Sequence, residues 1–198
     1  MLVSTFELLV KRQFPKPADL PIIVPDELKP KIQQLSRTVI QGYFLTISNL
    51  NAFDATISLV FTVVSTPPVE TSKLVALLDV DGINVGELPD LEPDLALNKI
   101  RFTRKIPASD TGLFLIQPNI LIPKLLEKEN FEVRGYVEVF ISSLSTGFNA
   151  AKLLLTPEHR GTFYTDLDEP KKSPLQLDQI AYALPTAHGG SLFELSFQ

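Results

Sequence analysis

The sequence predicts an all-β protein, built as a single antiparallel β-sandwich of seven to nine strands with at most one or two short helices. Apolar and polar residues alternate with a period of two along several short segments, as in strands that bury one face. Turn-forming residues separate these segments, and no long segment has a helical period. Unequal strand lengths and the lack of an internal repeat favour a sandwich over a barrel.

The clearest strand signal lies between Val39 and Val64. In its second half the alternate residues fall into two sets, one for each face of the strand. One set is mostly hydroxylated, and the other is wholly apolar and consists of Ile57, Leu59, Phe61 and Val63. The break at 48–51 contains two asparagines and predicts a turn between two strands. In the first half both parities carry apolar residues. If Phe44 faces the core, then Tyr43 faces outward.

Further strands follow along the chain. We expect a buried strand at Leu74–Val80 and a strong one at Val133–Ser142. The segment Lys99–Ile106 alternates, with Ile100, Phe102 and Ile106 predicted to face inward and Lys99, Arg101 and Lys105 outward. Shorter strands are expected at Leu113–Ile116, Leu153–Leu155, Gly161–Tyr164, Ile180–Leu184 and Ser191–Phe197. The segment Ile120–Lys128 is the one place where a helix is expected, with Pro123 in its first turn.

Five prolines stand between Pro15 and Pro30, which predicts an irregular or polyproline-like arm. We therefore divide the chain into residues 1–35, an N-terminal strand and Pro-rich arm packed on the main domain, and residues 36–198, the sandwich.

Composition and charge exclude several classes of function. A net charge of −5 disfavours nucleic-acid binding, which needs a basic surface. The chain has no cysteine, so disulfides, zinc–thiolate sites and thiol nucleophiles are excluded. No segment is long and apolar enough to span a bilayer, and the first residues do not resemble a signal peptide. We expect a cytoplasmic protein without a membrane span.

Three segments together carry a resemblance to known folds. They are the strand–turn–strand opening, the basic strand ending in Ile106-Pro107-Ala108, and Val133–Val137. This pattern resembles small immunoglobulin-like sandwiches and is similar to the sandwiches of bacterial sensory-rhodopsin transducers. The resemblance implies a sandwich architecture, and it brings no functional residue to this chain.

The sequence gives little indication of a catalytic site or of a metal site built on histidines. Asp178, His188 and Ser191 are the residue types of a hydrolase triad, but the Gly-x-Ser-x-Gly elbow of that fold is missing. His159 and His188 lie far apart without a metal-ligand spacing. We therefore expect that the protein is not an enzyme and that it binds no cofactor.

A loop calcium site is an open alternative. Asp79, Asp81 and Asn84 place oxygen ligands at nearly alternating positions, and further acidic residues follow. The glycine of an EF-hand loop would come two places later than Gly82 does. This pattern favours, as the alternative function, a small-ligand or carbohydrate-binding sandwich with loop-bound calcium.

Two predicted strands carry apolar residues on both faces, which indicates that the second face is also covered. We expect the outward residues Tyr43, Tyr136 and Phe140 to form an interaction surface. The first hypothesis is thus a non-enzymatic interaction or structural module that self-associates as a homo-oligomer or binds a protein partner.

Overall fold

The computed structural model describes residues 1–15, 20, 22–64, 70–80, 92–93, 98–144, 148–164 and 177–196. These residues form eleven strands and two short α-helices, which confirms the all-β prediction. The strands are β1 (Leu2–Arg12), β2 (Thr38–Asn49), β3 (Ala55–Val63), β4 (Leu74–Asp79), β5 (Glu92–Pro93), β6 (Lys99–Ile106), β7 (Thr111–Pro118), β8 (Asn130–Leu144), β9 (Ala150–Tyr164), β10 (Leu177–Ala183) and β11 (Leu192–Ser196). The helices are α1 (Lys29–Leu35) and α2 (Pro123–Lys128), and a 3-10 turn, η2, spans Thr71–Lys73. The immunoglobulin-like arrangement stays a prediction.

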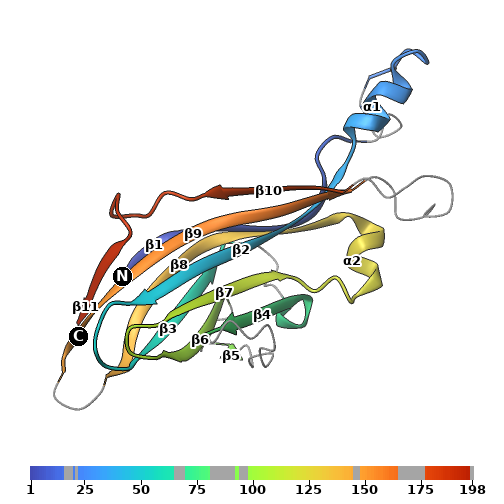
Figure 1. The fold of residues 1–198 in the computed structure, drawn as a ribbon. Helices are drawn as coiled ribbons and strands as arrows, with labels where there is room; N and C mark the ends of the chain where they lie inside the picture. Colours follow the sequence, from blue (N-terminus) through green and yellow to red (C-terminus); the bar gives the residue numbers. More distant parts are fainter. Residues whose placement is uncertain are drawn as a thin grey trace.

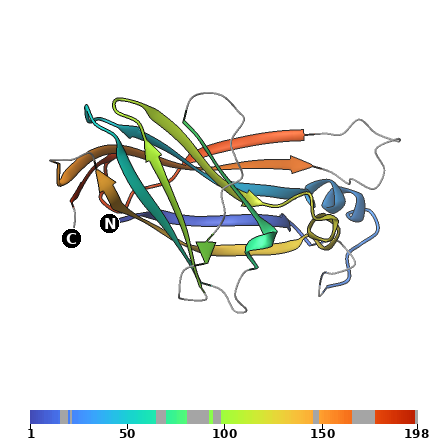
Figure 2. The ribbon, with the colours of Figure 1, turned by 90° about the horizontal axis from the view of Figure 1, so that it is seen from below.

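The strands form two layers that join at one place (Figure 1). One layer has the order β1-β8-β3-β6-β5, and the other has the order β4-β7-β2-β9, with β10 and β11 both on the far side of β9. All the pairs are antiparallel. Both chain ends lie at one end of the molecule and both helices at the other (Figure 2).

Strand β2 joins the layers because its edge changes partner at Gly42. Thr38–Gln41 pairs with β1, whereas Tyr43–Ser48 pairs with β7. Along its other edge β2 pairs with β9 from end to end. A side chain at Gly42 would press on the carbonyl oxygen of Ile116 in β7, so the absence of a Cβ allows this close crossing.

The core lies between the layers and is rich in aromatic rings. Phe61 of β3 contacts the rings of Phe6, Tyr43 and Phe114, with centroid distances of 5.2, 5.8 and 5.5 Å. The inward parity predicted for β3 and for β6 is confirmed, since the apolar members of both sets are buried. The chain has no Trp, and phenylalanine supplies most of the aromatic bulk of the core instead.

The predicted break between the two strands exists, but it lies at 50–54 rather than at 48–51, and it does not join two paired strands. β2 and β3 belong to opposite layers, so the chain crosses from one to the other. The buried side chain of Asn49 holds this crossing. Its Nδ2 donates to the carbonyl oxygens of Phe53, Ile106 and Pro107 at 2.8, 3.1 and 2.9 Å, and its Oδ1 accepts from the backbone N–H of Asn51 at 3.1 Å.

The segment before residue 36 differs from the predicted arm in two respects. β1 lies inside the sheet, paired with both β2 and β8, so these residues belong to the sandwich itself. The stretch predicted to be irregular also ends in a helix: α1 begins at Lys29, with Pro30 in its first turn, where proline is tolerated. Figure 1 shows α1 projecting beyond the end of the sheet.

Two short strands predicted at Leu153–Leu155 and Gly161–Tyr164 are parts of the single strand β9. Pro157 separates them in the sequence without breaking the strand. Its carbonyl oxygen accepts from the N–H of Leu184, so its peptide groups face the β10 side of β9. Proline has no N–H to donate, but an N–H at this position would point toward β10. The pairing of β9 with β2 therefore loses no hydrogen bond. The helix expected within Ile120–Lys128 is confirmed as α2.

Candidate interaction surfaces

A closed ring of hydrogen bonds lies where β1 separates from β2. The backbone N–H of Glu7 donates to Nε2 of His159 at 3.0 Å, and the carbonyl oxygen of Glu7 accepts from the side-chain amide of Gln41 at 3.3 Å. The hydroxyl of Tyr182 lies 3.0 Å from Nδ1 of His159 and donates to Oε1 of Gln41 at 3.2 Å. These side chains replace the strand partner that the Glu7 peptide groups lack on this edge.

The ring determines the protonation of His159. Because Nε2 accepts from a backbone N–H, the neutral imidazole carries its proton on Nδ1 and donates it to Tyr182. Burial lowers the pKa of His159, and the negative charge of Glu7 opposes this shift only in part. Burial also raises the pKa of the Tyr182 hydroxyl. Both ring nitrogens are engaged, so His159 does not offer a metal ligand.

Strand β10 forms an exposed edge of the sheet. Among the described residues it pairs only with β9, and all seven of its residues are exposed. Ile180 is 48% exposed and Tyr182 is 42% exposed, although both belong to the face that lies toward His159. Figure 1 shows β10 along the upper border of the molecule.

The free peptide groups of β10 follow from its register. Hydrogen-bonded pairs alternate in an antiparallel ladder, and the bond from Leu184 N to Pro157 O makes Leu184 and Pro157 such a pair. The next hydrogen-bonded residues are then Tyr182, Ile180 and Asp178. Gln179, Ala181 and Ala183 consequently direct their N–H and C=O groups away from β9, toward the open edge.

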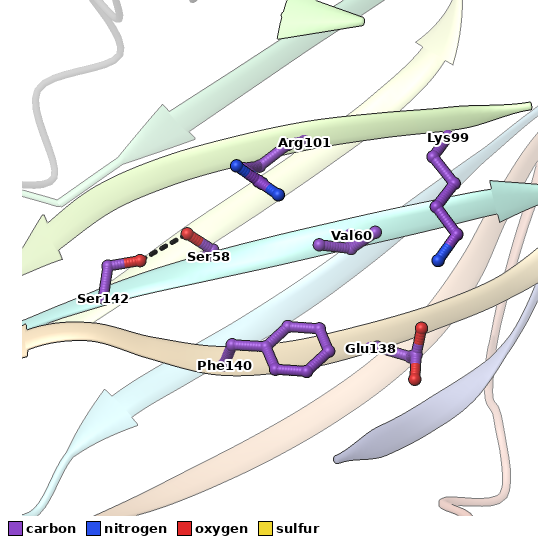
Figure 3. A pocket seen from close by; sticks show the side chains of 7 residues that line it. All are labelled: Ser58, Val60, Lys99, Arg101, Glu138, Phe140 and Ser142. Atoms are coloured by element: carbon purple, nitrogen blue, oxygen red, sulfur yellow. Dashed lines mark hydrogen bonds between the residues drawn. The ribbon is translucent and has the colours of Figure 1, made fainter. Parts of the chain in front are cut away.

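The second candidate surface lies on the outer face of β3, β6 and β8. A hollow of about 320 Å³, here called the outer trough, runs along β3; it is lined by Ser58, Val60, Lys99, Arg101, Glu138, Phe140 and Ser142. Figure 3 shows the two basic side chains on β6, Val60 and Ser58 on the middle strand, and Glu138 with Phe140 on β8. The floor is nearly covered, because Ser58 and Val60 are buried beneath these walls.

Two of the three residues predicted as an interaction surface lie on this outer face. Phe140 is 39% exposed and lines the outer trough, and Tyr136 is half-buried four residues earlier on the same face of β8. The third, Tyr43, is completely buried, so its predicted outward position is wrong. Its hydroxyl bonds with Ser4 at 3.0 Å, and Phe44 instead faces outward, beneath the guanidinium of Arg160.

The arm before β2 exposes several apolar side chains. Ile23 is 98% exposed, and Ile22, Leu28 and Leu35 are exposed as well. The stem of the arm is firmly held: Gln13 N donates to the carbonyl oxygen of Arg37, and Ser36 Oγ donates to that of Phe14 at 2.5 Å. The sequence predicted that the arm packs on the main domain. Val24 is buried, whereas its neighbours Ile22 and Ile23 are exposed.

The calcium alternative is only partly within the described residues. Asp79 ends β4, and its Oδ1 is buried without a hydrogen-bond partner among the described residues. Asp81 and Asn84 lie outside the described residues. In the part of the chain that the structure describes, no three His, Cys, Asp or Glu side chains gather as a metal site.

The structure does not bring the three triad-type residues together. Asp178 forms an ion pair with Arg37 near the start of β10, whereas His188 follows the end of that strand. Asp178 and Ala183 are five positions apart along the strand, which corresponds to about 17 Å. The His188 ring packs edge-on against Phe193 at a centroid distance of 5.3 Å.

Comparisons with family models, with curated proteins and with solved structures find no match to this chain. None of the helices in the described ranges is long and apolar enough to cross a membrane. The candidate surfaces therefore depend on the geometry of the chain itself.

Sequence reasoning missed the edge position of β10, because pairing order is a long-range property. One local signal was available: the strand LDQIAYA contains neither Lys, Arg nor Pro, the residues that usually protect an open edge. The outer trough was partly anticipated, since the outward row of β6 and the outward Phe140 were both predicted.

Proposed function

We propose that this protein is a non-enzymatic interaction module that self-associates, and that two copies join edge to edge through β10. The observation that carries the proposal is the open, exposed edge of this strand. Unpaired peptide groups on a regular strand are a template for another strand, and natural proteins that remain monomeric usually block such an edge.

A twofold axis at Ala181 supplies a register for this pairing. Antiparallel pairing about that axis places Ala181 opposite itself and Gln179 opposite the partner's Ala183. All of these residues direct their peptide groups to the open edge, so the hydrogen bonds of both strands match. Ile180 then lies opposite the partner's Tyr182, which covers the two most exposed apolar side chains of that face.

Charge also permits this register. Asp178 is the one charged residue of β10, and the axis at Ala181 places it opposite the partner's Leu184 rather than opposite a second carboxylate. Gln179 and the two alanines leave the other face free of bulky side chains at the junction. The joined sheets would run continuously from one copy into the other.

The outer trough supports such a protein contact less well. Three of its seven lining side chains are charged. Charged residues are depleted from the centres of protein interfaces, whereas the exposed surface of β10 contains aliphatic and aromatic side chains.

Analytical ultracentrifugation over a range of concentrations tests the proposal. The unaltered protein is expected to be a dimer. Ala181→Lys places two like charges opposite each other on the axis, and Ala181→Pro removes an N–H that points to the open edge, so both variants are expected to be monomers. Thr156→Lys, on the exposed face of β9, is the matched control and should remain dimeric.

Two outcomes would contradict the proposal. One is an unaltered protein that stays monomeric at every concentration. The other is a dimer that persists in both Ala181 variants. If Ile23→Ser dissociates that persistent dimer, the projecting arm is the interface and β10 is not.

A further inference from the structure

We infer that the outer trough is a carbohydrate-binding site that accepts a single sugar residue. This inference is independent of self-association through β10, because the trough lies on β3, β6 and β8, in the other layer.

The size of the outer trough suits a single sugar residue. A hollow of about 320 Å³ has room for roughly ten water molecules at about 30 Å³ each. This volume lies at the lower end of the range for small-molecule sites, about 300–1,000 Å³. A pyranose ring fits such a space, whereas a protein segment requires a longer groove.

The register places donors and acceptors on opposite walls. Glu138 and Arg101 both pair with Val60, from its two sides, so the three residues form one row across the strands. Neighbouring strands are about 4.8 Å apart, which places the backbones of the two walls about 10 Å from each other. A bound molecule therefore meets the carboxylate of Glu138 on one side and the ammonium group of Lys99 on the other, where Arg101 also lies, already in contact with another part of the protein.

This arrangement selects the chemistry of the ligand. A phosphate or simple carboxylate only accepts hydrogen bonds and would be repelled by Glu138, and an amine only donates and would be repelled by the basic wall. Hydroxyl groups donate to a carboxylate such as Glu138 and accept from an ammonium such as that of Lys99. A polyhydroxylated ring satisfies both walls at the same time.

The apolar and hydroxyl groups of the trough agree with a sugar. Phe140 offers an apolar surface to the C–H face of a pyranose, beside the buried Val60. Beside them, Ser58 Oγ bonds to Thr103 Oγ1 at 2.6 Å and to Ser142 Oγ at 2.5 Å. Three hydroxyls joined by two bonds retain one hydrogen, which one end of this chain can offer to a ligand. Ser142 is the extra residue of a bulge in β8, which turns it toward Ser58.

Titration of the full chain with methyl glycosides of neutral hexoses and of hexuronates, followed by two-dimensional amide NMR, tests the inference. Saturable shifts confined to the outer trough are expected for at least one of these sugars. Phe140→Ala and Glu138→Gln should each weaken its binding by about tenfold or more. Phe148→Ala and Glu127→Gln, an exposed aromatic and an exposed carboxylate elsewhere, should leave the binding unchanged.

The inference is wrong if no sugar of the panel gives saturable shifts, or if the shifts lie outside the trough. It is also wrong if both trough variants keep full affinity while their spectra show a folded protein. Free glycine and glutamine are added as zwitterionic probes; if they bind and the sugars do not, the trough recognises an amino acid.

Discussion

Nε2 of His159 on β9 accepts a hydrogen bond from the backbone N–H of Glu7 on β1, 3.0 Å away. The two residues are 152 positions apart in the sequence. Their contact closes the place where the two layers separate, and it requires an unprotonated Nε2. This requirement links a single histidine to the stability of the whole sandwich.

Acidification is expected to lower the free energy of unfolding through His159. Burial lowers the pKa of His159 in the folded state, while the unfolded chain keeps a histidine pKa of about 6.5. As the pH falls through about 6.5, the unfolded state takes up the proton first, so stability is lost until the pH is below the folded pKa. Urea denaturation at a series of pH values measures this loss.

The variant His159→Gln isolates this contribution, because an amide can still accept from Glu7 but does not titrate. The free energies of unfolding of the two proteins should differ by a constant amount at alkaline pH, and on acidification the unaltered protein should lose stability relative to the variant. If His188→Gln rather than His159→Gln abolishes the loss of stability, the assignment to His159 is wrong.

Tyr182→Phe is expected to lower the free energy of unfolding by about 1 kcal/mol, within the range for an orphaned buried donor. Removal of the hydroxyl leaves both Nδ1–H of His159 and Oε1 of Gln41 without this partner. Tyr136→Phe, on the outer face of β8, is the matched control and should change stability by less than about 0.5 kcal/mol. If the two variants lose the same free energy of unfolding, the ring of hydrogen bonds does not stabilise the protein in the way predicted.

Asn49→Ala should destabilise the protein by about 2–4 kcal/mol, because it removes one donor group from three backbone carbonyls and opens a buried space. Chemical denaturation measures the loss. Asn119→Ala, at a less buried position beside η2, serves as the control and should cost less than about 1 kcal/mol. A small effect of Asn49→Ala would mean that the crossing from β2 to β3 does not depend on this side chain.

Gly135→Ala is expected to be among the most damaging single substitutions. A Cβ at this position would lie 1.9 Å from the carbonyl oxygen of Thr62 and 2.9 Å from the Phe6 ring, and backbone cannot yield to it as a side-chain end does. We expect a loss of about 3 kcal/mol or more, measured by thermal unfolding. Gly190→Ala meets no atom within 4 Å and should be close to neutral.

The sequence by itself determined the local properties of this chain. The period of two in β3 and β6 correctly assigned their inward residues, because alternation is a property of the strand backbone alone. Pro123 and the charges that follow it likewise indicated α2. The outward position of Phe140 was predicted in the same way.

Only the tertiary structure decided what depends on pairing between distant segments. In β2 both parities are apolar, so alternation could not choose between Tyr43 and Phe44; packing against Phe6 and Phe61 placed Tyr43 inside. The sequence predicted a break close to the end of β2, but not that this break joins opposite layers, because hydrogen-bond partners are set by the whole sheet. The open edge of β10 and the two walls of the outer trough arise for the same reason: each is formed by strands that meet only once the chain has folded.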